Sequence, residues 1–229
     1  MPVASSVIVG DALAMAKRPG FLSYGGRALN MTLEDLWMHR NLKVNLVRST
    51  ITTTPYSNGP FNLETDYART YDMWYMVTGT PYFLNPCTLR DFDQDQQSGL
   101  SSYPSEWATD LSGVPTVGYG SLYVYPQSNM ALTLFHRYFV RRPDISTPET
   151  SSVVPWFEDQ DYLTVATAMR VMRITGDDRY ASFAMECDKL LLKHLLTEGD
   201  EQQAVRYVKL DPRMFKVKSS NRPTKSDPW

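Results

Sequence analysis

The sequence predicts an α+β protein whose helices come from both ends of the chain and whose strands come from its middle. Apolar residues recur at helical spacing in residues 29–37 and again in residues 156–197. Between these segments, β-branched and aromatic residues alternate, and a polar, basic stretch with prolines follows the last helix. We therefore expect a helical bundle built from both ends, a β-rich inserted domain and an extended C-terminal arm. The expected boundaries are 1–46 for the N-terminal helices, 47–154 for the insertion, 155–199 for a C-terminal helical hairpin and 200–229 for the arm.

Two helices are expected before the β-rich segment. The first covers residues 9–18, and Gly25 and Gly26 are expected to break the chain before the second. A capping pattern at Thr32 leaves open a later start for the second helix. The apolar residues that would share one face of that helix are Leu29, Leu33, Leu36 and Trp37.

Strands are expected over residues 46–54 and, as a short strand, a kink and a longer strand, over 61–77. Residues 121–140 look like two strands joined by a proline-containing turn. Both faces of the second strand carry apolar residues, so we expect it to be covered on both sides. The polar stretch 91–121 is too long for an ordinary connection and predicts a short helix near 88–95 or a functional loop.

The C-terminal helices are expected over residues 156–175 and 178–197. Gly176 suits a helix C-terminus, and Asp177 suits the N-cap of the next helix. Because so short a link joins them, the two helices should form an antiparallel hairpin.

Composition excludes several classes of protein. The chain is 42% hydrophobic and 21% charged, which is ordinary for a soluble globular protein. Cys87 and Cys187 are its only cysteines, too few for a disulfide-rich scaffold or a four-cysteine zinc site. No apolar run approaches the roughly 18 residues of a membrane span. The first residues lack a basic stretch and a long apolar stretch, so no signal peptide is expected.

Charge is unevenly distributed along the chain. Residues 202–229 hold seven Lys/Arg against two Asp/Glu, whereas residues 1–201 hold 16 basic and 23 acidic groups. A basic tail on an acidic body indicates an arm that binds an acidic partner, and a solvated terminus is the alternative.

The sequence contains no recognised catalytic, cofactor-binding or metal-binding motif. It contains no G-x-S-x-G, no phosphate-binding glycine loop, no H-E-x-x-H and no C-x-x-C, so we expect no catalytic residue, cofactor or metal. Alternate aspartates resemble a calcium loop but lack its glutamate, and are interpreted as an acidic turn: Asp91, Asp93 and Asp95. Three carboxylates at a helix start are interpreted as favourable to the helix dipole rather than as an acid–base pair: Glu158, Asp159 and Asp161.

The remaining reactive side chains favour structural roles. Cys187 lies among apolar residues and is expected in the core, as is His136, for which an interface is the alternative. His194, near a helix end, is expected to interact with the helix dipole. Aromatic residues gather in the β-rich part, where core or protein-interface use is favoured over stacking on bases because basic residues are sparse there.

The order of elements resembles the head-to-tail adaptor (connector) proteins of tailed bacteriophages, including the tail tubular protein A type of short-tailed phages. The resemblance rests on four segments, and Glu64 stands in the second where the family often has proline. The segments are the two N-terminal helices, the run 61–69 (FNLETDYAR), the strand–proline–strand stretch 122–140, and the hairpin 156–197 with its Thr-Gly-Asp-Asp corner.

This resemblance implies a structural protein of the virion rather than an enzyme. It implies a ring, usually dodecameric, that joins the portal protein to the tail nozzle protein, assembles in the bacterial cytoplasm and lets DNA pass without specific binding. In several members a C-terminal arm enters the portal. The residues that we expect to contact the portal are Arg206, Lys209, Arg213, Phe215, Lys216, Lys218 and Trp229.

Two other functions remain open from the sequence. The basic tail would suit a nucleic-acid-binding accessory protein, although the acidic body and the lack of a recognition motif oppose it. A hydrolase using carboxylates such as Asp159 and Asp161 is the third hypothesis, and nothing in their spacing demands it.

Overall fold

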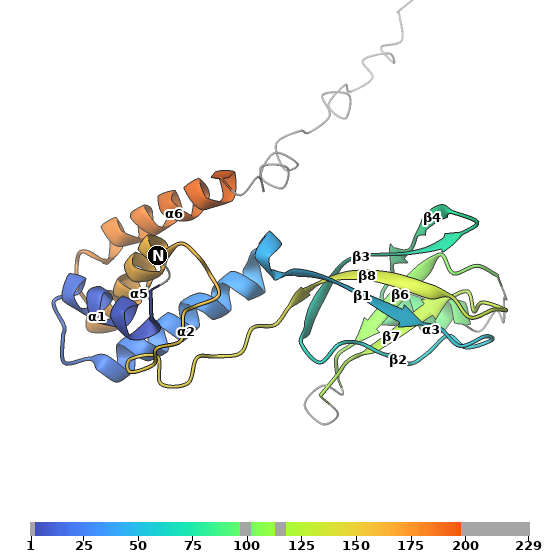
Figure 1. Ribbon diagram of the computed structural model, residues 1–229, viewed down its shortest axis with the longest axis horizontal. Coiled ribbons are helices and arrows are strands. Elements are labelled where there is room, and N and C mark those ends of the chain that lie inside the picture. The colour runs from blue at the N-terminus through green and yellow to red at the C-terminus, as the bar shows by residue number, and fades with distance from the viewer. Residues whose placement is uncertain (1–2, 97–101, 113–117, 198–229) are drawn as a thin grey trace, which may run out of the picture.

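The computed structural model describes residues 3–96, 102–112 and 118–197, and within them the chain is a mixed α+β protein, as predicted (Figure 1). Four of the helices lie at one end of the molecule, and the strands lie at the other end (Figure 1). Strands come from the middle of the described chain, between α2 and α5.

The helical end is built around one apolar core. Its helices are α1 (Ser5–Met15), α2 (Leu22–His39), α5 (Gln160–Thr175) and α6 (Tyr180–Thr197). Leu29 of α2 and Leu163 of α5 are completely buried there, and Cys187 of α6 lies in the same core, as expected. Helices distant in the sequence therefore depend on one another for burial of their apolar faces.

Gly25 and Gly26 do not break the chain, contrary to prediction, because they lie inside α2. A Cβ atom on Gly25 would lie 2.8 Å from Cγ1 of Val9, so α1 and α2 approach closely at this point. The later start at Thr32 is also wrong, since the Thr32 hydroxyl donates to the carbonyl of Ala28 within the helix (2.9 Å). Close packing rather than a turn explains the glycine pair, with Gly25 against α1 and Gly26 against Pro148 and Glu149.

Replacing Gly25 by alanine is expected to destabilise the protein by about 1–3 kcal/mol, because the new methyl group meets the stiff, buried Val9 side chain. Gly10, which is exposed on α1 and has no atom near its Cβ position, is the matched control. Gly10→Ala should raise stability by about 0.5–1 kcal/mol through helix propensity alone. Urea unfolding measures both, and a stabilising Gly25→Ala would contradict the close approach.

Two four-stranded sheets form the other end of the molecule. The first has the order β1-β8-β3-β4, with bounds Leu46–Thr52, Thr133–Val140, Tyr67–Val77 and Thr80–Phe83. The second has the order β2-β7-β6-β5, with bounds Phe61–Asn62, Ser121–Tyr125, Glu106–Asp110 and Asn85–Pro86. Neighbouring strands are antiparallel except β5 and β6. A second core contains Leu122, Leu134 and Met73.

Several element predictions are confirmed. The short and long strands expected over 61–77 are β2 and β3, and the helix expected near 88–95 is α3 (Leu89–Gln96). A 3-10 turn (Lys43–Asn45) precedes β1. The stop at Gly176 is confirmed by its left-handed backbone (φ 66°), and Oδ1 of Asp177 accepts from the amide of Arg179 (3.0 Å). Helices α5 and α6 then pack together as a hairpin.

Other predictions are wrong in the strand region. The two strands expected over residues 121–140 are present as β7 and β8, but they belong to different sheets and do not pair as a hairpin. The face of β8 that carries Phe135 and Arg137 is only half-buried, so the strand is not fully covered on both sides. β6, within the expected 91–121 loop, was not predicted: it is a polar strand in which only Ala108 is buried. Finally, α5 begins at Gln160 rather than 156, since Asp159 caps it.

Candidate functional site

The residues predicted to contact the portal lie outside the described part of the chain. They are Arg206, Lys209, Arg213, Phe215, Lys216, Lys218 and Trp229. The structure does place the point from which that segment starts, the end of α6 at Thr197. His194, in the last turn, has its ring centroid 4.6 Å from that of Phe157 and Nδ1 4.0 Å from Oδ2 of Asp159. The C-terminal segment therefore starts next to the beginning of α5.

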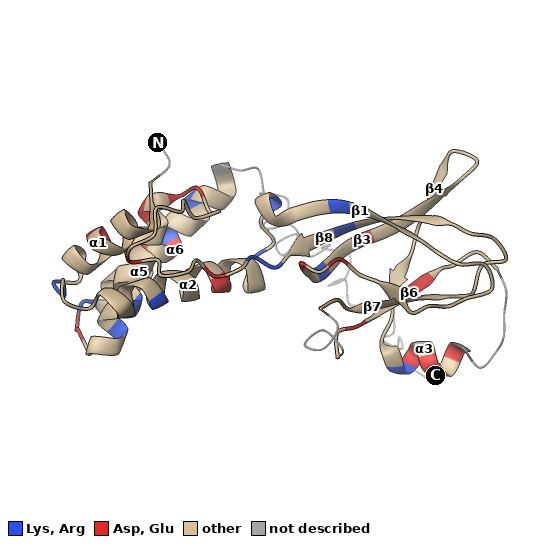
Figure 2. Cartoon of the chain, turned by 60° about the horizontal axis from the view of Figure 1, so that its bottom comes forward, with Lys and Arg blue, Asp and Glu red and all other residues tan. Residues whose placement is uncertain are grey.

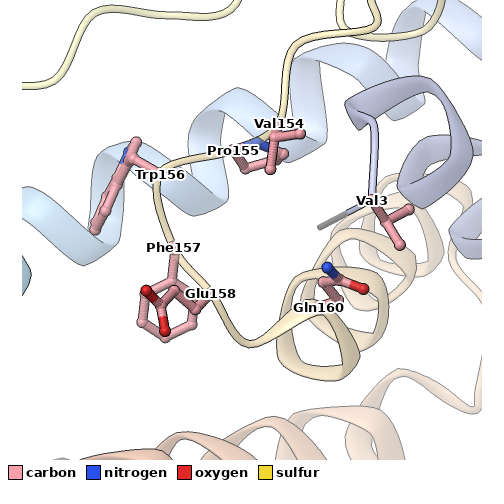
Figure 3. Close-up of a pocket in the computed structure, with 7 residues that line it drawn as sticks. All are labelled: Val3, Val154, Pro155, Trp156, Phe157, Glu158 and Gln160. Carbon is pink, nitrogen blue, oxygen red and sulfur yellow. The ribbon is translucent and has the colours of Figure 1, made fainter. Parts of the chain in front are cut away.

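A pocket of about 440 Å³ lies at this same place (Figure 3). The chain before α5 curves around the pocket, and Val3 lies on the remaining side (Figure 3). Most of its lining is apolar, with one carboxylate and one amide. The residues that line it are Val3, Val154, Pro155, Trp156, Phe157, Glu158 and Gln160. We call this cavity the α5 pocket.

The irregular chain that forms the α5 pocket follows from its sequence. Pro155 lacks a backbone donor and disfavours helix in the residue before it. Asp159 then caps the helix, which begins at Gln160, and its Oδ1 accepts from the amide of Tyr162 (2.9 Å). Phe157, buried between these two points, packs edge-on against Tyr162 (5.5 Å between ring centroids) and fixes the position of the pocket wall.

The carboxylates predicted at this helix start have structural partners or face solvent. Asp159 caps α5, as the dipole interpretation predicted, while Glu158 and Asp161 are not buried. An anionic side chain in the first turn of a helix is stabilised by the unpaired N–H groups. The rim of the α5 pocket is therefore acidic.

Arg69 connects the two ends of the molecule. It lies on β3 and over the ring of Phe139, with its guanidinium carbon 4.7 Å from the ring centroid. Partial burial lowers its pKa from the ordinary value. Its donors reach the end of α2 and the residues after it: the backbone oxygens of Trp37 (2.9 Å), Met38 (2.7 Å) and Arg40 (2.7 Å), and Oδ1 of Asn41 (2.9 Å). A cation is favourable at this negative end of the helix dipole.

Arg142 joins the segment that follows β8 to the segment that precedes β1. Its Nε donates to Oδ1 of Asn45 (3.0 Å) and its Nη2 to the carbonyl of Val44 (3.1 Å). Its guanidinium also lies over the Trp156 ring, 5.9 Å from the centroid. Neither arginine contact has a signature in the sequence, because the partners are distant along the chain and include backbone carbonyls.

An aromatic surface covers the outer face of the first sheet. Trp74 stacks on Phe135 with 5.6 Å between ring centroids, and Phe83 lies 5.9 Å from Trp74 on its other side. The guanidinium groups of Arg48 and Arg137 lie 5.5 and 5.0 Å from the Trp74 centroid. Arg48 lies on β1 and Arg137 on β8, neighbouring strands on which Figure 2 shows basic positions. Phe83 and Arg48 are exposed, while Trp74, Phe135 and Arg137 are half-buried, and aromatic and arginine side chains at a surface are typical of protein interfaces.

The other reactive groups lie in unreactive surroundings. Burial, with Asp188 and Glu186 nearby, raises the pKa of Cys187 to about 11, so its thiol is protonated at neutral pH. Asp91 accepts from the Thr88 hydroxyl (2.7 Å) at the start of α3.

Within the described ranges, no three His, Cys, Asp or Glu side chains gather as metal ligands would. None of the described helices is both long and apolar enough to span a membrane.

His136 is completely buried, which confirms its predicted place in the core. Its Nε2 lies 2.9 Å from the Thr70 hydroxyl oxygen, and its ring stacks on Tyr138 (5.0 Å between centroids). Nδ1 has no hydrogen-bond partner among the described residues. Burial lowers the pKa of His136 to about 4, against a smaller opposite effect from Asp72. The imidazole is therefore neutral at physiological pH.

Comparison with known proteins gives no family: no protein-family model matches the sequence, and no curated protein matches it.

Proposed function

We propose that the chain is a structural head-to-tail adaptor of a tailed-bacteriophage virion. In this proposal its subunits form a ring, dodecameric as the resemblance implies, between the portal protein and the tail nozzle protein. The ring encloses the channel for DNA, and the basic C-terminal arm docks on the portal. The protein would be assembled in the bacterial cytoplasm and carried in the virion.

The observation that carries the proposal is the sharing of one core by helices from both ends of the described chain. α1 and α2 pack against α5, while residues 46–140 supply the strands. We interpret this arrangement as a helical bundle with a β-rich inserted domain, which is the order of elements in the resemblance to phage adaptors. A fixed junction through Arg69 and Arg142 also suits a protein that connects two larger assemblies.

Exposed apolar residues on α6 supply a surface for neighbouring subunits. Met185, Leu192 and Leu196 are 65%, 52% and 45% exposed, although such side chains are usually buried. Their spacing of seven and four residues places them along one side of the helix. A subunit contact in a ring would cover this stripe, and repetition around the ring would make weak contacts collectively strong.

Co-expression with the portal protein of the same genome tests the proposal directly. Imaging of the purified complex should show a ring of this chain on the portal. Deletion of residues 205–229 should abolish portal attachment, because the deleted segment holds all seven predicted portal-contact residues. The body of the truncated protein should stay folded, which circular dichroism measures. Full-length protein prepared in parallel is the control. Attachment of the truncated protein at wild-type level would remove the arm from the mechanism.

The full-length and truncated proteins also distinguish the adaptor from the nucleic-acid-binding alternative. DNA binding that falls steeply with salt and disappears with residues 205–229 would favour an accessory protein that binds nucleic acid through its tail. An adaptor should instead bind the portal and show no such DNA binding.

A further inference from the structure

We propose that the α5 pocket binds this chain's own C-terminal segment, with Phe215 as the inserted side chain. This inference concerns the isolated protein and does not rest on the proposed adaptor function. The pocket is a formed cavity of about 440 Å³, and α6 ends beside it. Four arguments support this occupant: the position of the chain end, the apolar lining, the charge of the rim and the length of the segment.

The last turn of α6 lies close to the pocket. Phe157 lines the pocket and lies against His194, three residues before the last residue of α6. Thr197, the last residue of α6, is the point in the described chain to which residues 198–229 are joined. Phe215 follows Thr197 by 18 residues, which can span up to about 60 Å when extended. The segment is therefore long enough for Phe215 to reach the pocket.

The lining matches an apolar side chain. Val154 is 46% exposed, and Val3 and Trp156 are half-buried, so the pocket leaves apolar surface uncovered. An aromatic ring inserted between them would remove that surface from water, which is the main favourable contribution to such contacts. Phe215, preceded by Met214, offers two adjacent apolar side chains of suitable size.

The charges around the pocket match those around Phe215. Glu158 lines the pocket, and Asp161 follows in the first turn of α5. The nearby cation, Arg142, already donates to Asn45 and Val44 and lies over Trp156. The segment places Arg213, Lys216 and Lys218 on both sides of Phe215. Opposite charges would thus meet at the rim while the ring enters the apolar interior.

Attachment to the same molecule favours this occupant over other chains. A tethered segment acts at an effective concentration near the millimolar range, which exceeds the concentration of other copies in dilute solution. The contact is therefore intramolecular in the free protein, and it covers basic residues that a partner would otherwise reach.

Trypsin cleavage of the full-length protein, without any partner, tests the contact. The cleavage sites after Arg213, Lys216 and Lys218 should be protected in the wild type, and mass spectrometry should report the rate at each. Val154→Asp places a charge in the pocket and should raise these rates about tenfold. Val153→Asp is the matched control, because the neighbouring Val153 is 54% exposed but is not among the residues that line the pocket, and it should leave the rates unchanged.

Phe215→Ser provides a second test that does not alter the body of the protein, and it should also raise cleavage about tenfold. Protection should be constant over roughly a hundredfold range of protein concentration if the contact is intramolecular. Equal cleavage of the wild type and both variants would overturn the proposal. Protection that grows with concentration would also overturn it, in favour of binding between molecules. Portal attachment is measured separately, so neither result decides the adaptor function.

Discussion

Between pH 6.5 and pH 4 the protein is expected to lose about 3 kcal/mol of its free energy of unfolding through one side chain, His136. In the folded protein, burial holds the pKa of His136 at about 4, below its ordinary value of 6.5. As the pH falls through this window, the unfolded chain takes up a proton that the folded chain does not. The contribution of His136 to the free energy of unfolding is therefore fully present above pH 6.5 and is lost as the pH falls toward 4.

Urea unfolding at several pH values measures this effect. His136→Gln removes the titrating group, so its stability should change less steeply with pH in this window. His39→Gln is the matched control, because His39 is exposed at the end of α2, and it should keep the wild-type slope. The same slope in His136→Gln as in the wild type would show that His136 does not cause the acid sensitivity.

Replacing Arg69 by methionine is expected to lower stability by about 2–3 kcal/mol, since hydrogen bonds from a charged group are among the stronger ones in proteins. The substitution removes every bond from the guanidinium to residues 37–41 and leaves carbonyl groups near the end of α2 without this donor. The orientation of the strands relative to the helices should also become less defined. Urea unfolding measures the first effect, and small-angle X-ray scattering measures the second.

Arg48→Met is the control for loss of an arginine from the same sheet. Arg48 is exposed on β1, and its recorded contact is with the Trp74 ring. The change should therefore cost well under 1 kcal/mol. An unfolding midpoint and scattering profile of Arg69→Met equal to those of the wild type would contradict a connecting role for Arg69.

The sequence predicted elements best where a local pattern determines them. The stop at Gly176 was predictable because left-handed backbone depends on a single residue, whereas Asp177 accepts from the Arg179 amide in the turn before α6, which begins at Tyr180 rather than at 178. The interpretation of the glycine pair failed because Gly25 is required by contact with Val9 of another helix. β6 was missed because its polar sequence becomes a strand through pairing with β5 and β7, which are distant from it or follow it in the sequence.

The candidate site was less predictable than the fold. Carboxylates at the start of α5 were recognised from helix-dipole reasoning, but the α5 pocket depends on Val3, which is more than 150 residues away in the sequence. Arg69 likewise binds backbone carbonyls, which have no signature in the sequence. The predicted portal contacts stay predictions, because residues 198–229 lie outside the described part of the chain.

The chain passes between the helical end and the strand end twice, once at residues 40–45 and once after β8, and Arg142 ties the second passage to the first. A mechanical load applied to the strands would consequently be divided between two covalent links held side by side, instead of stretching or twisting a single one. Rotation about one peptide segment is blocked while the other is in place. Force and torque can thus be transmitted along the molecule with little compliance.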